Sequence, residues 1–313
     1  MFEKAFYNKA NSKIQEVFFM KLIMNMIQGF CMALADSVPG VSGGTVAFIL
    51  GFYDRFIGSL NQLLIGKKEE KKQAIGFLAK LGAGWVIGFG SSVVVLGKIF
   101  DTHIYELCSL FIGFSVFALP LIIAEEKECM KEKRSNLIFL FLGILIVAAL
   151  TYFHPSSSGN AVDLGYLSIA KGIYIFAAAA VAISAMVLPG ISGSTLLLIF
   201  GLYVPIMNAI RSFLHFDLKV IPVLFIFGMG IIAGLIGCIR MVKAALEKHR
   251  AKMIYLILGL VIGSVLAIIQ GPTTLKVPQS AMTWSTFHID FFVLGGVILG
   301  VLQLLKRFLE KKA

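Results

Sequence analysis

The sequence predicts an all-α polytopic membrane protein with two inverted-topology repeats, each made of a re-entrant helical hairpin and three transmembrane helices. Three observations lead to this fold class: an apolar composition, a motif that occurs twice, and short basic clusters between apolar runs. Of the 313 residues, 58% are hydrophobic and 14% are charged, whereas soluble domains are about half apolar and a quarter charged. The composition therefore excludes a soluble enzyme, a disordered tail and a disulfide-stapled secreted module.

The repeated motif divides the chain into two halves. Residues 36–53 read DSVPGVSGGTVAFILGFY, and residues 186–203, which lie 150 positions later, read MVLPGISGSTLLLIFGLY. Internal duplication is a frequent mark of secondary transporters, and we expect one membrane domain with repeats at 1–153 and 154–313. The twin also argues against a signal peptide cleaved after Ala35, because the segment belongs to the repeated fold. Four glycines match at an offset of 146: Gly82, Gly84, Gly88 and Gly113 with Gly228, Gly230, Gly234 and Gly259.

Each half contains five apolar runs that we expect to be helical. The runs are 18–35, 45–65, 76–97, 107–124 and 136–153, then 170–188, 195–210, 221–240, 253–270 and 290–306. In both halves only the PGxSG motif joins the first two runs, and Pro and Gly break helices. Apart from Asp36, these joints carry no charge suited to a membrane surface. We therefore expect re-entrant hairpins whose tips lie inside the bilayer; two full spans with a tight turn at the surface are the alternative.

Basic clusters predict the orientation of the chain. They lie at the N-terminus, in 66–73, 125–135 and 240–252, and at the C-terminus. Because Lys and Arg are enriched in cytoplasmic loops, both termini are expected in the cytosol. A returning hairpin plus three spans crosses the membrane an odd number of times. The halves are then inverted and their tips approach each other from opposite faces; full spans in place of the hairpins would give the same parity.

The two tips together resemble an anion site. Ser42 and Ser192 are natural N-caps, and each precedes a helix whose free N–H groups and positive dipole end face the tip. Such exposed backbone is tolerated at membrane depth only beside protein or a wet cavity. The alternative is that the PG pairs only kink packed helices. The predicted phosphate-binding residues are Pro39, Gly40, Ser42, Gly43, Gly44, Thr45, Pro189, Gly190, Ser192, Gly193, Ser194 and Thr195.

Few charged residues fall near the tips. Arg55 and Arg211 are predicted as secondary charge partners for a phosphate entering from either face, with interfacial anchoring as the alternative. Charges at membrane depth are costly and usually functional. Asp36 and Asp54 are therefore candidates for coupling to H⁺ or Na⁺, and the alternative role for Asp36 is to cap a helix.

Enzyme chemistry is not expected. The segment Gly40–Gly44 fits the G-x-S-x-G pattern of serine hydrolases, but such a serine needs an adjacent base. The five histidines all fall in predicted loops, and the twin motif breaks the pattern. The sequence contains no metal-ligand spacing, no Walker loop and no cofactor motif, so neither a metal nor a cofactor is predicted. The basic clusters mark topology and lipid head groups rather than nucleic acid.

The two segments ADSVPGVSGGTVAFILGFYDRFI and AMVLPGISGSTLLLIFGLY resemble the paired signatures of the bacterial polyprenyl-phosphate transporter family of the PopT type. The resemblance covers essentially the whole chain. It implies that undecaprenyl phosphate returns from the outer to the cytosolic leaflet, which recycles the lipid carrier of cell-envelope synthesis. The alternatives are an ion-coupled transporter of a small anion or solute, and a structural scaffold. A lipid transporter should open sideways toward the bilayer, whereas a solute carrier should enclose a polar cavity.

Overall fold

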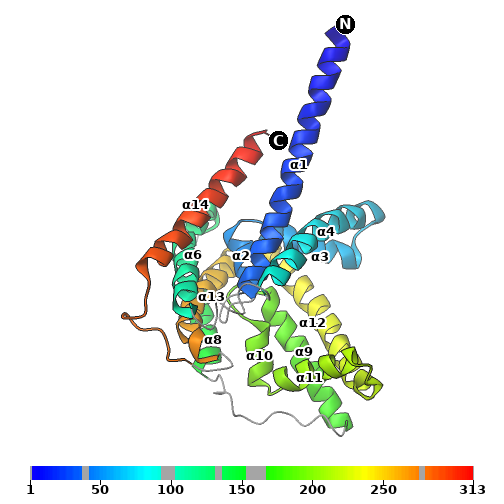
Figure 1. Cartoon of the computed structure of the whole chain (residues 1–313), viewed down its shortest axis with the longest axis vertical. Coiled ribbons are helices and arrows are strands. Elements are labelled where there is room, and N and C mark those ends of the chain that lie inside the picture. The colour runs from blue at the N-terminus through cyan, green and yellow to red at the C-terminus, as the bar shows by residue number, and fades with distance from the viewer. Residues whose placement is uncertain are drawn as a thin grey trace.

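The computed structural model describes residues 2–36, 42–92, 103–130, 136–152, 167–274 and 279–312, and every regular element in these ranges is a helix (Figure 1). Five segments are long and apolar enough to cross a membrane, which confirms a helical multi-pass membrane fold. They comprise α4 (Lys68–Ser91), α6 (Ile104–Glu125), α9 (Ile169–Val187), η3 (Leu218–Val220) with α12 (Ile221–Lys248), and α13 (Arg250–Gln270) continuing into η4 (Gly271–Thr274). Two shorter apolar stretches lie in α8 (Leu137–Tyr152) and α14 (Ile289–Lys312).

The segments that follow the two PGxSG motifs differ from the expected single helices. After α1 (Phe2–Asp36), the run 45–65 is divided into α2 (Gly43–Ile49) and α3 (Tyr53–Ile65). The run 195–210 is likewise divided into α10 (Gly193–Ile199) and α11 (Tyr203–Leu214). At the breaks, Gly51 and Gly201 have φ values of 71° and 64°. Glycine adopts this left-handed conformation without steric cost, so the twin glycines end the first short helix and redirect the chain.

Glycines also set the closest helix contacts, and these contacts recur in both halves. In the first half α4 packs along α1, and Gly84 lies against the backbone carbonyl of Met26. In the second half α12 packs along α9, and Gly230 lies against the carbonyl of Phe176. Membrane helices associate closely through such small residues, so these glycines allow the paired helices to approach each other closely. One turn further on, Gly88 faces Phe30 and Gly234 faces Ala180.

The last helix of each half packs against the other half. Helix α14 lies along α6, and α8 lies along α13. Two tyrosine hydroxyls make matching bonds across these pairs: Tyr105 donates to the carbonyl of Ser280 at 3.0 Å, and Tyr255 donates to the carbonyl of Met130 at 3.4 Å. The two donors, Tyr105 and Tyr255, are 150 residues apart, and so are the two acceptors, Met130 and Ser280. Equivalent residues of the two halves therefore make equivalent bonds. The two halves are therefore interlocked.

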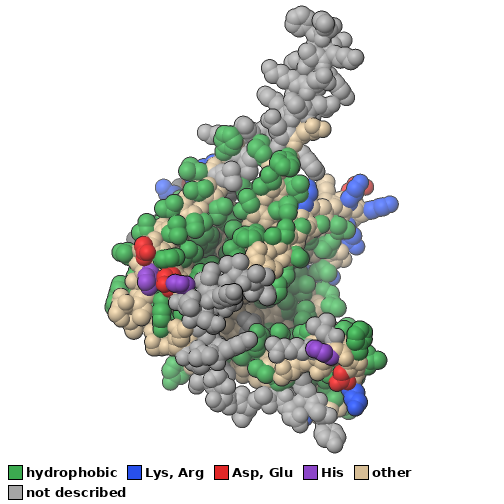
Figure 2. Space-filling view, viewed as in Figure 1, with side chains coloured by type: hydrophobic (Ala, Val, Ile, Leu, Met, Phe, Trp, Pro, Cys, Tyr) green, Lys and Arg blue, Asp and Glu red, His purple; other side chains and the backbone are tan. Residues whose placement is uncertain are grey.

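The buried core lies where the two halves meet. Every residue of α2 is buried, and the largest buried cluster joins α2 and α3 to α6, α12 and α13. The outside is apolar as well: hydrophobic side chains cover most of the described surface in Figure 2, and charged side chains gather toward its edges. On α8, for example, Ile138, Phe141 and Leu145 are all largely exposed. An apolar exterior of this kind suits contact with lipid.

The glycine contacts provide a test of the fold. A Cβ at residue 84 would overlap the Met26 carbonyl, whereas a Cβ at residue 82 of the same helix meets nothing within 4 Å. We expect Gly84→Ala to lower the free energy of unfolding by about 1–3 kcal/mol, as overpacking typically does. Gly82→Ala, the matched control, should leave stability unchanged or raise it, because Ala favours helix. Thermal unfolding of the purified variants in detergent measures both, and equal stability would contradict the packing described.

Candidate functional site

The two motif segments, which lie 150 residues apart in the sequence, touch each other. The backbone N–H of Gly190 donates to the Thr45 hydroxyl at 2.7 Å. The Tyr53 hydroxyl donates to the carbonyl of Val187 at 3.0 Å. Gly44 lies close to the same backbone segment: a Cβ added to Gly44 would lie 3.3 Å from the Met186 carbonyl oxygen. The structure therefore brings Gly44, Thr45 and Gly190 of the predicted site together.

The hydroxyl groups of the first motif cap α2. The Ser42 side chain accepts the Thr45 backbone N–H at 3.3 Å, and the two hydroxyls are 3.1 Å apart. This confirms Ser42 as an N-cap. Ser192 occupies the N-cap position of α10, but its side chain makes no capping bond to that helix.

Gly190 shapes the second motif. It has a φ of +89°, and a Cβ there would lie 2.5 Å from the carbonyl oxygen of Leu260 on α13. Both the backbone conformation and the contact with α13 thus require glycine at this position. The bend that points the second motif toward Thr45 depends on it.

Asp36 is the ionisable residue nearest to the motifs. It ends α1, and its carboxylate accepts the Gly43 backbone N–H at 2.6 Å and the Trp85 indole N–H at 3.1 Å. The first of these bonds agrees with the alternative role of Asp36, in which it caps a helix. The twin of Asp36 is Met186, whose side chain lies close to Gly193. The duplicated site therefore carries a carboxylate in one half and a thioether in the other.

A cavity of about 320 Å³ lies between these elements. Most of its wall is apolar, and the polar groups come from Asp36, Ser42, Ser192 and the Trp85 indole. Two of the lining side chains, Phe89 and Met186, are 45% and 36% exposed, so the cavity reaches the surface of the helices. It is lined by Asp36, Ser42, Trp85, Phe89, Ala179, Ala182, Ile183, Met186, Ser192, Gly193, Leu197, Phe227 and Ile231.

Of the predicted charge partners, Arg55 does not line this cavity. Arg55, on α3, stacks over the Phe77 ring of α4 with 4.1 Å from its guanidinium carbon to the ring centre. Asp54 pairs with Arg250 at 2.9 Å, and Arg250 also binds Glu126. Among the described residues that line the cavity, none is Lys or Arg.

Several predicted residues are placed only in part. Thr195 is half-buried on α10. Ser194 and Arg211 belong to α10 and α11, but their side chains are outside the described structure. Pro39 and Gly40 lie outside the described residues, and Pro189 is buried beside Gly190.

Sequence reasoning missed the aromatic part of the site. Trp85 holds the Asp36 carboxylate, and Phe89, one turn further along α4, forms part of the cavity wall. The available signal was that the chain has only two tryptophans and one of them falls in an apolar run. A buried indole N–H usually has a hydrogen-bond acceptor. Asp36, the first residue of the first motif segment, was a candidate acceptor for it.

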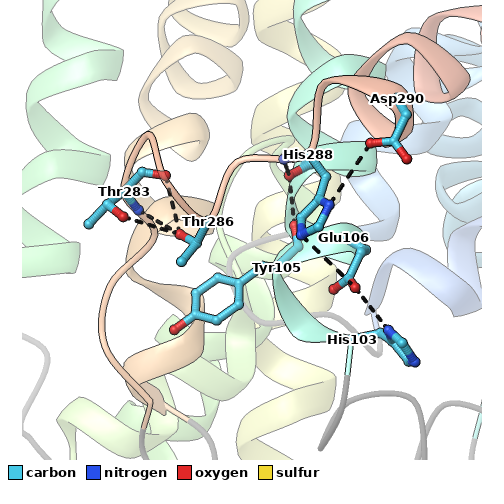
Figure 3. A network of polar contacts seen from close by, with 8 residues as sticks. His103, Tyr105, Glu106, Thr283, Thr286, His288 and Asp290 are labelled. Atoms are coloured by element: carbon cyan, nitrogen blue, oxygen red, sulfur yellow. Dashed lines mark hydrogen bonds and ion pairs between the residues drawn. The ribbon is translucent and has the colours of Figure 1, made fainter.

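A second polar cluster lies at the start of α6 and α14 (Figure 3). His103 Nδ1 is 2.9 Å from the Glu106 carboxylate, and His288 lies 4.0 Å from Glu106 and 3.9 Å from Asp290. The four histidines within the described ranges lie at helix ends or in loops, as expected, and none lines the cavity; His154 is outside those ranges. Within the same ranges no group of side chains has the arrangement of a metal site.

Apolar spanning helices around a cavity that both halves line define a helical membrane transport protein. The family model described as undecaprenyl phosphate translocase-like matches residues 32–286, and the chain belongs to this family. The chain is 30% identical over 277 residues to a Staphylococcus aureus protein named polyprenyl-phosphate transporter, an alignment that covers 88% of this chain and 94% of that protein. It is 28% identical over 255 residues to a Vibrio cholerae protein of the same name, covering 78% and 77%. The predicted family is confirmed. No solved structure matches the chain.

The bond between the motifs can be tested by removing its acceptor. Thr45→Val leaves the buried Gly190 N–H without this partner, which typically costs about 1–3 kcal/mol. Thr151→Val is the matched control, because the Thr151 hydroxyl only bonds the Val147 carbonyl of its own helix. We expect Thr45→Val to lower the unfolding temperature in detergent and Thr151→Val to leave it nearly unchanged. Equal effects would show that the bond between the motifs does not stabilise the fold.

Proposed function

We propose that this protein transports undecaprenyl phosphate, or a closely related polyprenyl phosphate, from the outer to the cytosolic leaflet of a bacterial plasma membrane. The observation that carries the proposal is the cavity between the two motif segments. Its wall is mostly apolar and it reaches the surface at Phe89 and Met186. A phosphate head would occupy the cavity while the polyprenyl tail stays in lipid. The names of the two relatives support the same substrate class.

The head group would be held by the polar groups of both tips. A phosphate that leaves water needs replacement hydrogen bonds, because an unpaired charge in an apolar medium is very costly. The donors in this proposal are the backbone N–H groups near Gly43, Gly44, Gly193 and Ser194 and the hydroxyls of Ser42, Thr45, Ser192 and Thr195. The Gly43 N–H and the Thr45 hydroxyl already have partners within the protein. Binding would therefore exchange internal bonds for bonds to phosphate, which favours release as well as capture.

Arg55 and Arg211 would act outside the cavity. Arg55 lies on α3 near the surface. Its neighbour Asp54 binds Arg250, on the side proposed as cytosolic, so Arg55 would attract the head group as it leaves the cavity rather than hold it inside. A close arginine pair inside the cavity would bind phosphate strongly through bidentate bonds. No described Lys or Arg lines the cavity. Transport requires release, and such a lining suits a carrier better than a tight binding protein.

The proposed topology has inverted halves, re-entrant tips and cytosolic termini. Two polar clusters support it. Arg250 and Glu126 form an ion pair, and they lie in 240–252 and 125–135, two segments that the charge pattern assigns to the cytosolic side. His103, Glu106 and His288 join segments assigned to the outer side (Figure 3). Each cluster thus contains only segments assigned to a single side of the membrane.

Reconstitution tests the transport proposal. We expect the purified protein to accelerate exchange of labelled undecaprenyl phosphate between the leaflets of proteoliposomes. Met186→Trp should slow exchange at least tenfold, because the larger ring fills the cavity. Met229→Trp on α12 is the matched control, since Met229 is 44% exposed and does not line the cavity. Robust uptake of a soluble anion without lipid exchange would instead support a solute carrier, and equal rates for the two variants would place the path elsewhere.

Cysteine labelling tests the topology. In a variant without the four native cysteines, we expect Trp284→Cys to react with an impermeant thiol reagent added outside intact cells. Glu247→Cys should react only after the cells are opened. Trp284 is 93% exposed and the Glu247 side chain is 65% exposed, so access to either depends on the side of the membrane. Labelling of both from the same side would contradict the inverted arrangement.

A further inference from the structure

Asp36 is the only ionisable side chain among the described residues that line the cavity. Its carboxylate is held in place by two N–H donors, the Gly43 amide at 2.6 Å and the Trp85 indole at 3.1 Å. The same cavity is the proposed seat of a phosphate, which carries about 1.5–2 negative charges near neutral pH. Two anions would therefore share one small, largely apolar space.

Like charges in a common site cannot both remain ionised at low cost, which is why paired carboxylates share a proton. No described Lys or Arg lines the cavity to offset the repulsion. Protonation of Asp36 removes the repulsion between its carboxylate and the phosphate without adding a bulky counterion. The protonated carboxyl also becomes a hydrogen-bond donor, so the group that would repel the phosphate would bind it instead.

We propose that Asp36 takes up one proton when the phosphate head enters the cavity and releases it when the head leaves, so that lipid phosphate and proton move together. This inference rests on the proposed function. The proton binds one carboxylate oxygen of Asp36 on entry and returns to water on the other side of the membrane after release. Protonation of the oxygen that accepts the Gly43 N–H weakens that bond, which frees the amide to donate to phosphate.

The surroundings of Asp36 favour a proton over a metal cation. Hard cations are bound by several oxygen ligands, whereas both oxygens of this carboxylate already face N–H donors. These donors present positive hydrogen atoms toward the position that a cation would take. The twin position, Met186, supplies a sulfur rather than a second carboxylate. The sequence left both H⁺ and Na⁺ open as coupling ions. The pairing of Asp36 with N–H groups favours H⁺.

Other titratable groups on the neighbouring helices do not line the cavity. Helix α2, which receives the Asp36 bond, has no titratable residue. Helices α4 and α14 pack against α1, and α9 and α12 supply the facing wall. The nearest titratable residues along these helices and along α1 are Cys31 on α1, Lys80 on α4, Tyr174 on α9, Cys238 on α12, and Asp290 and Arg307 on α14.

Proton coupling gives transport a direction. A membrane that is more acidic outside would drive the head group inward, toward the cytosolic leaflet. With one proton per lipid, a gradient of one pH unit can support an about tenfold ratio between the leaflets. Because a coupled carrier is reversible, proteoliposomes show this ratio whichever way the protein is inserted.

The experiment measures the leaflet distribution of labelled undecaprenyl phosphate in proteoliposomes, with equal pH or with the outside one unit more acidic. For the wild type we expect even exchange at equal pH and several-fold enrichment of the inner leaflet under the gradient. Asp36→Asn should lose the enrichment and at most equalise the leaflets. Glu247→Gln is the matched control, since this carboxylate lies near the end of α12 and pairs with Lys243 at 3.7 Å. It should respond as the wild type does.

The outcomes separate the two proposals. No exchange by the wild type at equal pH contradicts the proposed function. Exchange that ignores the pH gradient, that follows a Na⁺ gradient instead, or that keeps its gradient response in Asp36→Asn contradicts proton coupling by Asp36. If Asp36→Asn does not fold, Trp85→Phe provides the test. Because transport needs the proton on Asp36, exchange should fall as the pH rises. Without the indole donor the carboxylate binds its proton more readily, so the pH at which exchange falls to half should rise by about half a unit or more. An unchanged profile overturns the inference.

Discussion

Close contact between glycines and backbone carbonyls is the interaction on which the rest of this structure depends. Inside a bilayer, lipid tails are as apolar as Leu, so helices gain little from hydrophobic burial and must pack closely instead. Gly84 and Gly88 bring α4 against α1, and Gly230 and Gly234 bring α12 against α9. These two contacts place Trp85 beside Asp36 and the apolar face of α12 opposite the second motif. The cavity is therefore a product of helix packing rather than of loops.

The sequence was sufficient for the class of fold, the family and the motif pair, because apolar composition and a repeat at a fixed offset are properties of the chain itself. The offset of 146 also paired Gly84 and Gly88 with Gly230 and Gly234, and in the structure the members of each pair make matching contacts. The breaks at Gly51 and Gly201 could not be predicted, because a glycine within an apolar run is compatible with a continuous helix until its φ is known. Trp85 was missed for a similar reason: its contact with Asp36 joins residues 49 positions apart, and no periodicity reports such a pair.

The duplication is incomplete where the chemistry is concentrated. Ser42 and Ser192 both line the cavity, yet the lining residue at the position of Asp36 in the other half is Met186. An exact repeat would place two carboxylates near one phosphate and double the repulsion. With one ionisable group among its described lining residues, the cavity would undergo one change of charge in the proposed mechanism, while the thioether is a flexible apolar filler. The difference between the halves thus sets how many charges the site can exchange, while the similarity sets its shape.

The exchanged pairing of helices also affects how the chain is made. Helix α6 leaves the ribosome early, but the helix that covers it, α14, is the last to be synthesised. Until then the Gly113 face of α6, which lies against the carbonyl of Phe292 in the finished protein, has no partner from its own half. Insertion and assembly are therefore separate events: most spans enter the bilayer before the first half can close. A nascent chain that stops short of residue 289 would leave the face of α6 around Gly113 and Phe117 without its helix partner.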